Sequence, residues 1–195
     1  MCIQEKMEMG KRVILASASP RRQQLLKEVG IAYEVRLKPV LEEYPAGLPP
    51  EEVPEYLARL KASVFLPELQ EDELLITADT VVCIHDKIIG KPRGREEAIA
   101  MLRELSGNRH LVVTGVCLST REKQRLFSAH TFVFFRCLSE EEIAWYVDHY
   151  HPYDKAGAYG IQEWIGYVGI ERIEGSFYNV MGLPVQKLYE ELRSF

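Results

Sequence analysis

The chain has 195 residues, of which 47% are hydrophobic, and a formal net charge of −5 at pH 7. The hydrophobic content is too high for a disordered chain, and the acidic balance excludes a generally basic surface for nucleic acid. No apolar run approaches the ~20 residues that cross a bilayer, so we expect neither a membrane nor a nucleic-acid partner. The length suits a single domain over residues 1–195.

The four cysteines do not form a Cys-x-x-Cys pair, and three of them lie in apolar runs. We therefore expect reduced core cysteines in a cytoplasmic protein, with a disulfide or zinc role as the alternative. The four are Cys2, Cys83, Cys117 and Cys137. The N-terminal stretch MCIQEKMEMGKR lacks the apolar segment of a signal peptide, so none is expected.

A short apolar strand at 13–16 opens the predicted series of strands and helices. The helix after it has Ser19 as a suitable N-cap, Pro20 at its first position and Gly30 at its end. Apolar periodicity and turn residues predict the next elements. They are a strand at 33–37, a proline-rich loop at 41–54, a helix at 55–66, β-rich runs at 74–79 and 80–84 broken near Asp79, a strand at 87–89 and a helix within 95–107.

In the second half, two β-rich runs at 110–120 and 125–137 predict a long hairpin. Ser139 and Glu142 have the spacing of a capping box and begin a helix. The remaining elements are a glycine-rich loop at 153–162, a strand at 164–173 and a last helix at 184–193. Because helices and strands alternate around at least one antiparallel hairpin, we expect an α/β fold with a mixed sheet.

The segment from Ser17 to Arg22 joins the first strand to the first helix through small residues. Free N–H groups and the helix dipole make such a helix start a suitable anion site. Arg21 and Arg22 would be unfavourable there by up to ~1 kcal/mol for the helix alone. Either they are solvated and paired with acids such as Glu28, or their guanidinium forks grip a polyphosphate. The segment matches neither a Walker A loop nor a Rossmann fingerprint.

Asp79 and Thr80 interrupt an otherwise apolar run. A buried carboxylate is costly unless it is paired or binds a metal. Asp79 is therefore either an aspartate at a strand break that hydrogen-bonds its own turn, or a carboxylate that holds a divalent metal or activates water. Glu42 and Glu43 offer a second carboxylate, although acidic loop residues are usually solvated.

Two lysines and one loop complete the candidate residues. Lys61 and Lys91 are either ordinary surface lysines or point charges for phosphate oxygens. In the glycine-rich loop, Gly157 and Gly160 permit close backbone approach, and Gln162 offers both a donor and an acceptor. These residues suit a loop that recognises the edge of a nucleobase, and they equally suit an ordinary loop. The five histidines have no metal-ligand spacing, so we expect structural or surface roles for them.

Seven segments, in order between about residues 14 and 185, resemble the Maf-like nucleoside triphosphate pyrophosphatases. They are LASASPRRQQLL, LARLKA, ITADTVV, GKP, MLRELSG, YDKAGAYGIQ and GSFYNVMGLPV. Each segment alone is weakly specific, but seven in the family's order are strongly specific. The resemblance implies one Maf-like domain with an elongated mixed sheet, flanking helices and two lobes around a central cleft, similar to the inosine triphosphate pyrophosphatases.

The resemblance also implies an activity and a site. A nucleoside triphosphate is hydrolysed to the monophosphate and pyrophosphate by attack of water on the α-phosphate, with Mg²⁺ or Mn²⁺. Asp79 matches the proton acceptor, and Glu42 with Asp79 would hold the metal. The phosphate-binding positions are matched by Ser17, Arg22, Lys61 and Lys91. The positions linked to substrate choice are matched by Arg21, Thr80 and Gln162.

The YGIQ form around Gln162 resembles the branch that acts on dTTP and UTP, with modified pyrimidine nucleotides as a further possible substrate. A sister branch that prefers 7-methyl-GTP and a nucleotide-binding regulator of septum formation with little turnover are the alternatives. Leu41 departs from the family, which often has an Asp before the matching Glu, so the loop has one carboxylate fewer unless Glu43 substitutes. The implied assembly is a homodimer.

Overall fold

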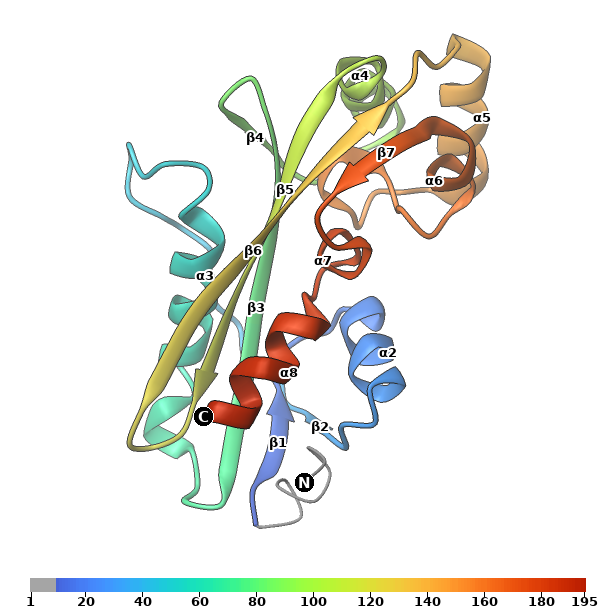
Figure 1. Ribbon diagram of the computed structural model, residues 1–195. Helices are drawn as coiled ribbons and strands as arrows, with labels where there is room; N and C mark the ends of the chain where they lie inside the picture. The colour runs from blue at the N-terminus through green and yellow to red at the C-terminus, as the bar shows by residue number, and fades with distance from the viewer. Residues whose placement is uncertain (1–9) are drawn as a thin grey trace. The chain divides into compact units, whose positions relative to one another are not determined.

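A computed structural model of the chain describes residues 10–195 (Figure 1). Cys2 and most of the stretch on which the signal-peptide prediction rests lie outside these residues. Among the described helices, none has the length and hydropathy of a membrane span.

The sheet is mixed, as expected from the sequence. Its strands are β1 (Arg12–Leu15), β2 (Glu34–Val35), β3 (Glu73–Ile84), β4 (Lys87–Ile89), β5 (Arg109–Ser119), β6 (Gln124–Phe135) and β7 (Ile170–Glu174). They pair in the order β2-β1-β3-β5-β6-β7, with β4 paired to β3. β1 is parallel to β2 and β3, whereas β4 is antiparallel to β3 and β7 is antiparallel to β6.

Local signals explain where several helices begin. The helices are α2 (Pro20–Glu28), α3 (Val53–Ser63), α4 (Arg95–Leu105), α5 (Glu140–Tyr150), α6 (Trp164–Gly169), α7 (Phe177–Met181) and α8 (Val185–Ser194), with 3₁₀ turns η1 (Leu66–Glu68) and η2 (Ala156–Ala158). The side chain of Ser19 accepts a hydrogen bond from the N–H of Arg22 and caps α2. Ser139 and Glu142 form the predicted capping box at the start of α5.

Two expected elements differ in the structure. The predicted break near Asp79 is wrong, because β3 is one continuous strand through that residue. The predicted strand at 164–173 is half wrong, since it begins as helix α6 and becomes β7 only at Ile170. The helix starts there because the carbonyl oxygen of Glu163 accepts hydrogen bonds from the N–H groups of Gly166 and Tyr167.

The cysteine prediction is confirmed for two residues and wrong for a third. Cys83 and Cys117 are free and buried, whereas Cys137 is free and exposed. Cys137 follows the end of β6 at Phe135, so its side chain is no longer held against the sheet.

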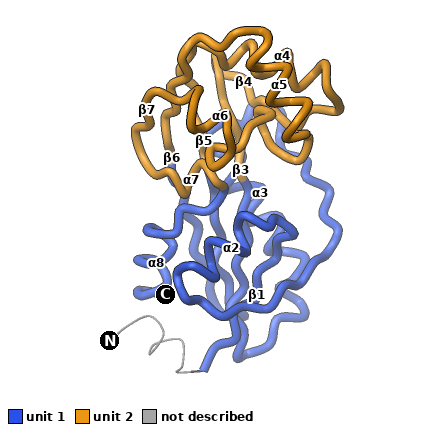
Figure 2. The backbone as a smooth tube through the Cα atoms, turned by 90° about the vertical axis from the view of Figure 1, so that its right-hand side faces the viewer, with its two compact units in different colours: residues 1–79, 114–129, 182–195 blue, residues 80–113, 130–181 orange. Residues whose placement is uncertain are grey.

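The chain divides into two compact units (Figure 2). Among the described residues, the first consists of residues 10–79, 114–129 and 182–195. The second consists of residues 80–113 and 130–181. Three of the four boundaries fall inside β3, β5 and β6, so these strands contribute to both units, and the fourth follows the end of α7.

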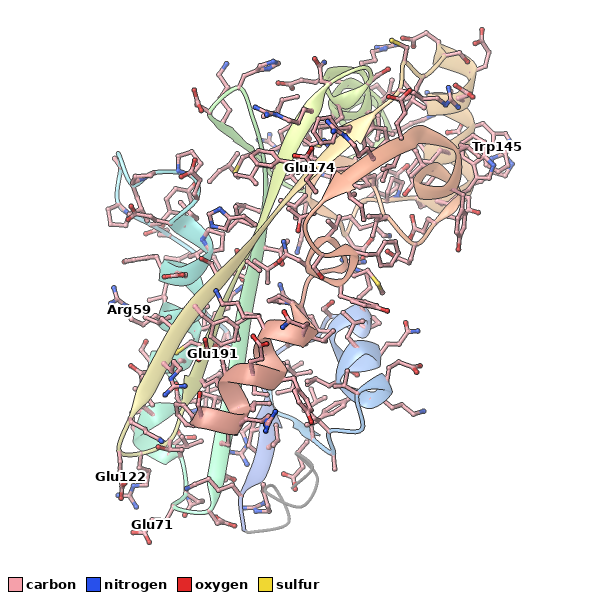
Figure 3. All side chains as sticks on the ribbon, in the orientation of Figure 1. Arg59, Glu71, Glu122, Trp145, Glu174 and Glu191 are labelled. Atoms are coloured by element: carbon pink, nitrogen blue, oxygen red, sulfur yellow. The ribbon has the colours of Figure 1, made fainter. Side chains whose placement is uncertain are left out.

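In the first unit, α3 lies on one side of the sheet and α2 and α8 on the other (Figure 1). The core between α3 and the sheet is a cluster of Ile14, Ala58, Ala62, Phe65, Leu69, Leu75 and Cys117. A Cβ on Gly115 would lie 2.3 Å from the backbone of Pro54 and Glu55, so this glycine lets α3 begin directly against β5. On the other side, Arg125 of β6 pairs with Glu191 of α8 at 3.0 Å. Glu191 is labelled on α8 in Figure 3.

In the second unit, α4 packs against α5, and two ion pairs between arginines of α4 and acids of α5 join the helices. His110 of β5 lies in an aromatic cluster with Phe135 and Tyr159 and is hydrogen-bonded to the Tyr159 hydroxyl at 2.7 Å. Burial lowers the pKa of His110 to about 3, so its ring is neutral at physiological pH. This histidine is structural, as predicted.

A buried carboxylate at the start of β3 makes stability depend on pH. The side chain of Glu73 is 1% exposed and accepts hydrogen bonds from Arg36, Arg12 and the N–H of Gln70. The bonds from Arg36, with smaller contributions from Gln70 and Arg12, lower the pKa of Glu73 from 4.5 to about 2, against the opposing effect of burial. Because the folded-state pKa is depressed, the stabilisation is complete above pH 4.5 and is lost as pH falls toward 2.

As the pH falls from 4.5 to 2, the free energy of unfolding should decrease by on the order of 2 kcal/mol because Glu73 becomes protonated. This figure allows for solvent screening of its half-exposed partner Arg12. Urea unfolding of the wild type and of Glu73→Gln over this pH range measures the effect. The variant should be less stable at neutral pH and lack this part of the slope, whereas Glu71→Gln, at a 92% exposed side chain, should keep it. Equal slopes for the wild type and Glu73→Gln would contradict the assignment.

Candidate active site

The loop between β1 and α2 is organised around the hydroxyl of Ser17. Ser17 is buried, and its Oγ accepts hydrogen bonds from the N–H of Ser19 and from Nη1 of Arg22, both at 3.3 Å. Since both bonds use the oxygen as an acceptor, the Ser17 O–H can still donate to an oxygen of a ligand. The loop therefore presents a hydroxyl beside a helix N-terminus and a guanidinium, which is a suitable environment for phosphate.

The side chain of Arg22 joins three segments of the first unit. Besides Ser17, it donates from Nε to the carbonyl oxygen of Gly182 at 2.7 Å and from Nη1 to that of Ala78 at 2.8 Å. Burial lowers the pKa of Arg22 and the charge of Asp79 opposes that shift, but a guanidinium stays protonated in either case. Arg22 is thus a fixed positive charge beside β3. Arg21 precedes it in the first turn of α2 and is half-buried.

Lys61 of α3 lies between two carboxylates. Its Nζ is 2.6 Å from Oδ1 of Asp79 and 3.0 Å from Oε1 of Glu42. Asp79 is 8% exposed, and a charge at that depth in a strand is tolerable because a cation lies within hydrogen-bonding distance. The structure therefore favours the paired carboxylate over an aspartate that bonds its own turn.

The carboxylates around Lys61 have the chemistry of a site for a hard cation. Their two oxygens converge on one positive atom, and Mg²⁺ or Mn²⁺ prefers such ligands. Within residues 10–195, no group of three His, Cys, Asp or Glu residues is arranged to hold a metal. A pair is sufficient when substrate phosphates complete the coordination, as is common for Mg²⁺. In the loop, Leu41 is exposed, and it is Glu42 that reaches Lys61.

The other predicted site residues belong to the second unit. Thr80 follows Asp79 in β3 and is half-buried, and Lys91 is exposed after β4. The N–H of Gly157 donates to the carbonyl oxygen of Gly90 at 3.0 Å, which joins the Gly-Lys-Pro segment to the glycine-rich loop. Within this unit the structure therefore links the segments that carry Lys91 and Gln162.

Gln162 has an incompletely satisfied side chain. Its Oε1 is buried and has no hydrogen-bond partner among residues 10–195. A buried amide oxygen without a partner costs about 1–3 kcal/mol, so a ligand that donates a hydrogen bond there would be favoured. This is the type of group expected for recognition of a base.

Two residues near Gln162 were not indicated by the sequence patterns. Tyr146 of α5 is fully buried and hydrogen-bonds to Glu163, which directly follows Gln162. In the sequence, Tyr146 is recognisable only as a tyrosine on the apolar face of a helix. Its hydrogen-bond partners, Gly160 and Glu163, lie 14 and 17 residues further along the chain. Such a signal does not distinguish it from an ordinary core aromatic residue.

Comparison with known proteins identifies close relatives. The sequence profile of the family described as "Maf-like protein" matches residues 12–195. A protein named dTTP/UTP pyrophosphatase from Bacteroides thetaiotaomicron is 57% identical over 183 residues, which covers 93% of this chain and 95% of that protein. A protein of the same name from Porphyromonas gingivalis is 57% identical over 187 residues, with 94% of each chain covered.

A solved structure described as a nucleoside-triphosphatase, or dITP/XTP pyrophosphatase, from Mycobacterium abscessus is also similar. It is 14% identical with a TM-score of 0.36, and the match covers 64% of this chain and 72% of that one.

Proposed function

Because the chain belongs to the Maf-like protein family, we propose that it is an enzyme that hydrolyses dTTP and UTP to the nucleoside monophosphate and pyrophosphate. Relatives named dTTP/UTP pyrophosphatase share 57% of its residues over nearly the full length. The structural observation that supports this activity is the cluster of Asp79, Lys61 and Glu42 in the unit that also carries Ser17 and Arg22. A carboxylate, a cation and donors for phosphate are the groups that such a hydrolysis requires.

In the proposed reaction, water attacks the α-phosphorus. A new P–O bond forms, the bond from the α-phosphorus to the oxygen that bridges to the β-phosphorus breaks, and pyrophosphate leaves with that electron pair. Asp79 accepts the proton of the attacking water. Oδ1 of Asp79 contacts Lys61, and a carboxylate has a second oxygen with which to accept a proton.

Fixed positive charges stabilise the phosphates as negative charge moves to the leaving group. Arg22 supplies a guanidinium already held in place by carbonyl oxygens, so little reorganisation is needed when the substrate binds. Ser17 donates its hydroxyl hydrogen to a phosphate oxygen. We assign Lys61 and Lys91 the same electrostatic role as Arg22.

We further propose that Glu42 and Asp79 hold Mg²⁺ or Mn²⁺. When bound, the metal would add positive charge next to the substrate phosphates and orient them. Both carboxylates already face one cationic nitrogen, which supports the choice of these two residues.

For substrate choice we propose Gln162, with Arg21 and Thr80. Thymine and uracil both have an N3–H, which supplies the donor that the buried Oε1 of Gln162 requires. The amide NH₂ of Gln162 can donate to a ring carbonyl of the same base. The proposal also includes a cytoplasmic location, which the free cysteines of the core support, and a homodimeric state, which the family resemblance implies.

The activity is tested by measuring pyrophosphate release from a panel of nucleotides with the purified protein and Mg²⁺. The panel contains dTTP, UTP, dCTP, 7-methyl-GTP and a 5-modified uridine triphosphate. The proposal predicts the highest kcat/KM for dTTP and UTP or for the modified pyrimidine. A preference for 7-methyl-GTP would indicate the sister branch, and tight nucleotide binding without turnover would indicate a regulator.

A further inference from the structure

Gln162 occupies a central position of a four-residue turn. The N–H of Glu163 donates to the carbonyl oxygen of Gly160 at 3.0 Å, which closes the turn with Ile161 and Gln162 between its ends. The two central residues of a β-turn are positioned by the residues at its ends, which the hydrogen bond between those ends brings together. The groups that fix Gly160 and Glu163 therefore determine where the amide of Gln162 lies.

One hydroxyl fixes both ends. The N–H of Gly160 donates to the hydroxyl oxygen of Tyr146 at 3.0 Å, and that hydroxyl in turn donates to Oε2 of Glu163. The Tyr146 ring is fully buried, so packing around the ring holds the hydroxyl in place. Burial and the neighbouring Glu163 raise the pKa of Tyr146, and the hydroxyl remains a donor throughout the physiological range.

A buried lysine completes this network. Nζ of Lys155 is 3.1 Å from Oε1 of Glu163 and 2.8 Å from Oδ1 of Asp154. The two oxygens of the Glu163 carboxylate are therefore divided between Lys155 and Tyr146. Because a charged carboxylate with only 18% of its side chain exposed needs such partners, removing either one should disturb the turn.

The packing around the turn leaves little room for adjustment. A Cβ on Gly160 would lie 2.7 Å from Cδ of Glu163. A Cβ on Gly166 of α6 would lie 1.8 Å from the carbonyl oxygen of Ile161. Both glycines allow the turn to close around the Glu163 side chain, so its geometry depends on contacts that a small displacement would break.

We propose that Tyr146, Glu163 and Lys155 are positioning residues for substrate choice, which hold the turn so that the unpartnered Oε1 of Gln162 is presented to the nucleobase. The inference rests on the proposed function and adds residues that do not themselves touch substrate. Tyr146 is the most informative of the three, since Tyr146→Phe removes one oxygen and keeps the ring.

The test compares kcat/KM for dTTP and dCTP in the wild type, Tyr146→Phe, Gln162→Ala and the double variant. We expect the dTTP-to-dCTP ratio to fall about tenfold in Tyr146→Phe, as for the loss of a buried hydrogen bond. In the Gln162→Ala background, Tyr146→Phe should leave the ratio within about twofold, because the side chain that it positions is gone. An independent effect of similar size in both backgrounds would overturn the proposal.

A matched control and a second variant separate positioning from stability. Tyr150→Phe removes a hydroxyl from a partly exposed tyrosine of the same helix, whose ring stacks on that of Tyr146, and should keep the wild-type ratio. Glu163→Gln keeps an acceptor for Tyr146 but removes the charge that faces Lys155, and should lower the ratio also. If Tyr146→Phe does not fold, Glu163→Gln decides in its place.

An unchanged ratio in the folded variants, with or without a lowered Tm, also overturns the inference. That outcome leaves the proposed activity intact. A wild-type protein that releases no pyrophosphate from any nucleotide of the panel would instead refute the proposed function itself.

Discussion

The Asp79→Asn variant is expected to lose at least about 100-fold in kcat/KM for dTTP, since general-base assistance typically contributes about 10²- to 10⁴-fold. Asparagine has nearly the same shape but cannot accept the proton of the attacking water, and it is a weaker ligand for a divalent metal. Lys61 keeps Glu42 as a counter-ion, so the variant should fold. Pyrophosphate release under steady-state conditions, with circular dichroism as the check on folding, measures this effect.

Asp72→Asn is the matched control. Asp72 directly precedes β3 and is half-exposed in an ion pair with Arg12, so the same chemical change there should leave kcat/KM within about twofold of the wild type. Near wild-type turnover of Asp79→Asn would remove this residue from the reaction, whatever the result for the control.

The second large effect is expected for Lys61→Met, which should change metal binding and turnover in opposite directions. Without nucleotide, the ammonium group of Lys61 lies between Glu42 and Asp79, in the space that the proposed metal would need. Without it, Mn²⁺ should bind the nucleotide-free protein about tenfold more tightly, a gain of about 1.4 kcal/mol. Turnover of dTTP should nevertheless fall about 100-fold, because a positive charge on the phosphates is lost.

Calorimetric titration with Mn²⁺ alone measures the metal affinity separately from activity. Lys38→Met removes the same charge from the same unit, where Lys38 pairs with Glu68 at 2.6 Å, and should not tighten Mn²⁺ binding. Unchanged Mn²⁺ affinity in Lys61→Met would place the metal away from Glu42 and Asp79. Tighter binding in both variants would show a general effect of net charge instead.

Local signals in the sequence were sufficient for much of the fold. The N-cap at Ser19 and the capping box at Ser139 depend on side chains and N–H groups a few residues apart, so they are readable from the sequence. The prediction of a strand break at Asp79 was wrong because it depended on a residue that is distant in the sequence. The residue that makes a carboxylate tolerable inside β3 is Lys61, which lies on α3 and is brought there only by the fold.

The candidate site shows the same limit. The segment around Arg22 indicated an affinity for phosphate, but the carbonyl groups of Ala78 and Gly182 that hold its guanidinium lie 56 and 160 residues away. The hydrogen bonds of the Tyr146 hydroxyl to the turn that carries Gln162 also join segments that are separate in the chain. Residue types and family resemblance therefore indicated the groups for the chemistry, whereas the residues that orient those groups required the structure.

The position of water attack tests the account most directly. Hydrolysis of dTTP in ¹⁸O-labelled water, followed by mass spectrometry of both products, reports which phosphorus the water oxygen joins. Attack on the α-phosphorus, as proposed for water activated by Asp79, puts the label in dTMP and leaves pyrophosphate unlabelled. Label in pyrophosphate, or release of orthophosphate and dTDP, would contradict the proposed reaction.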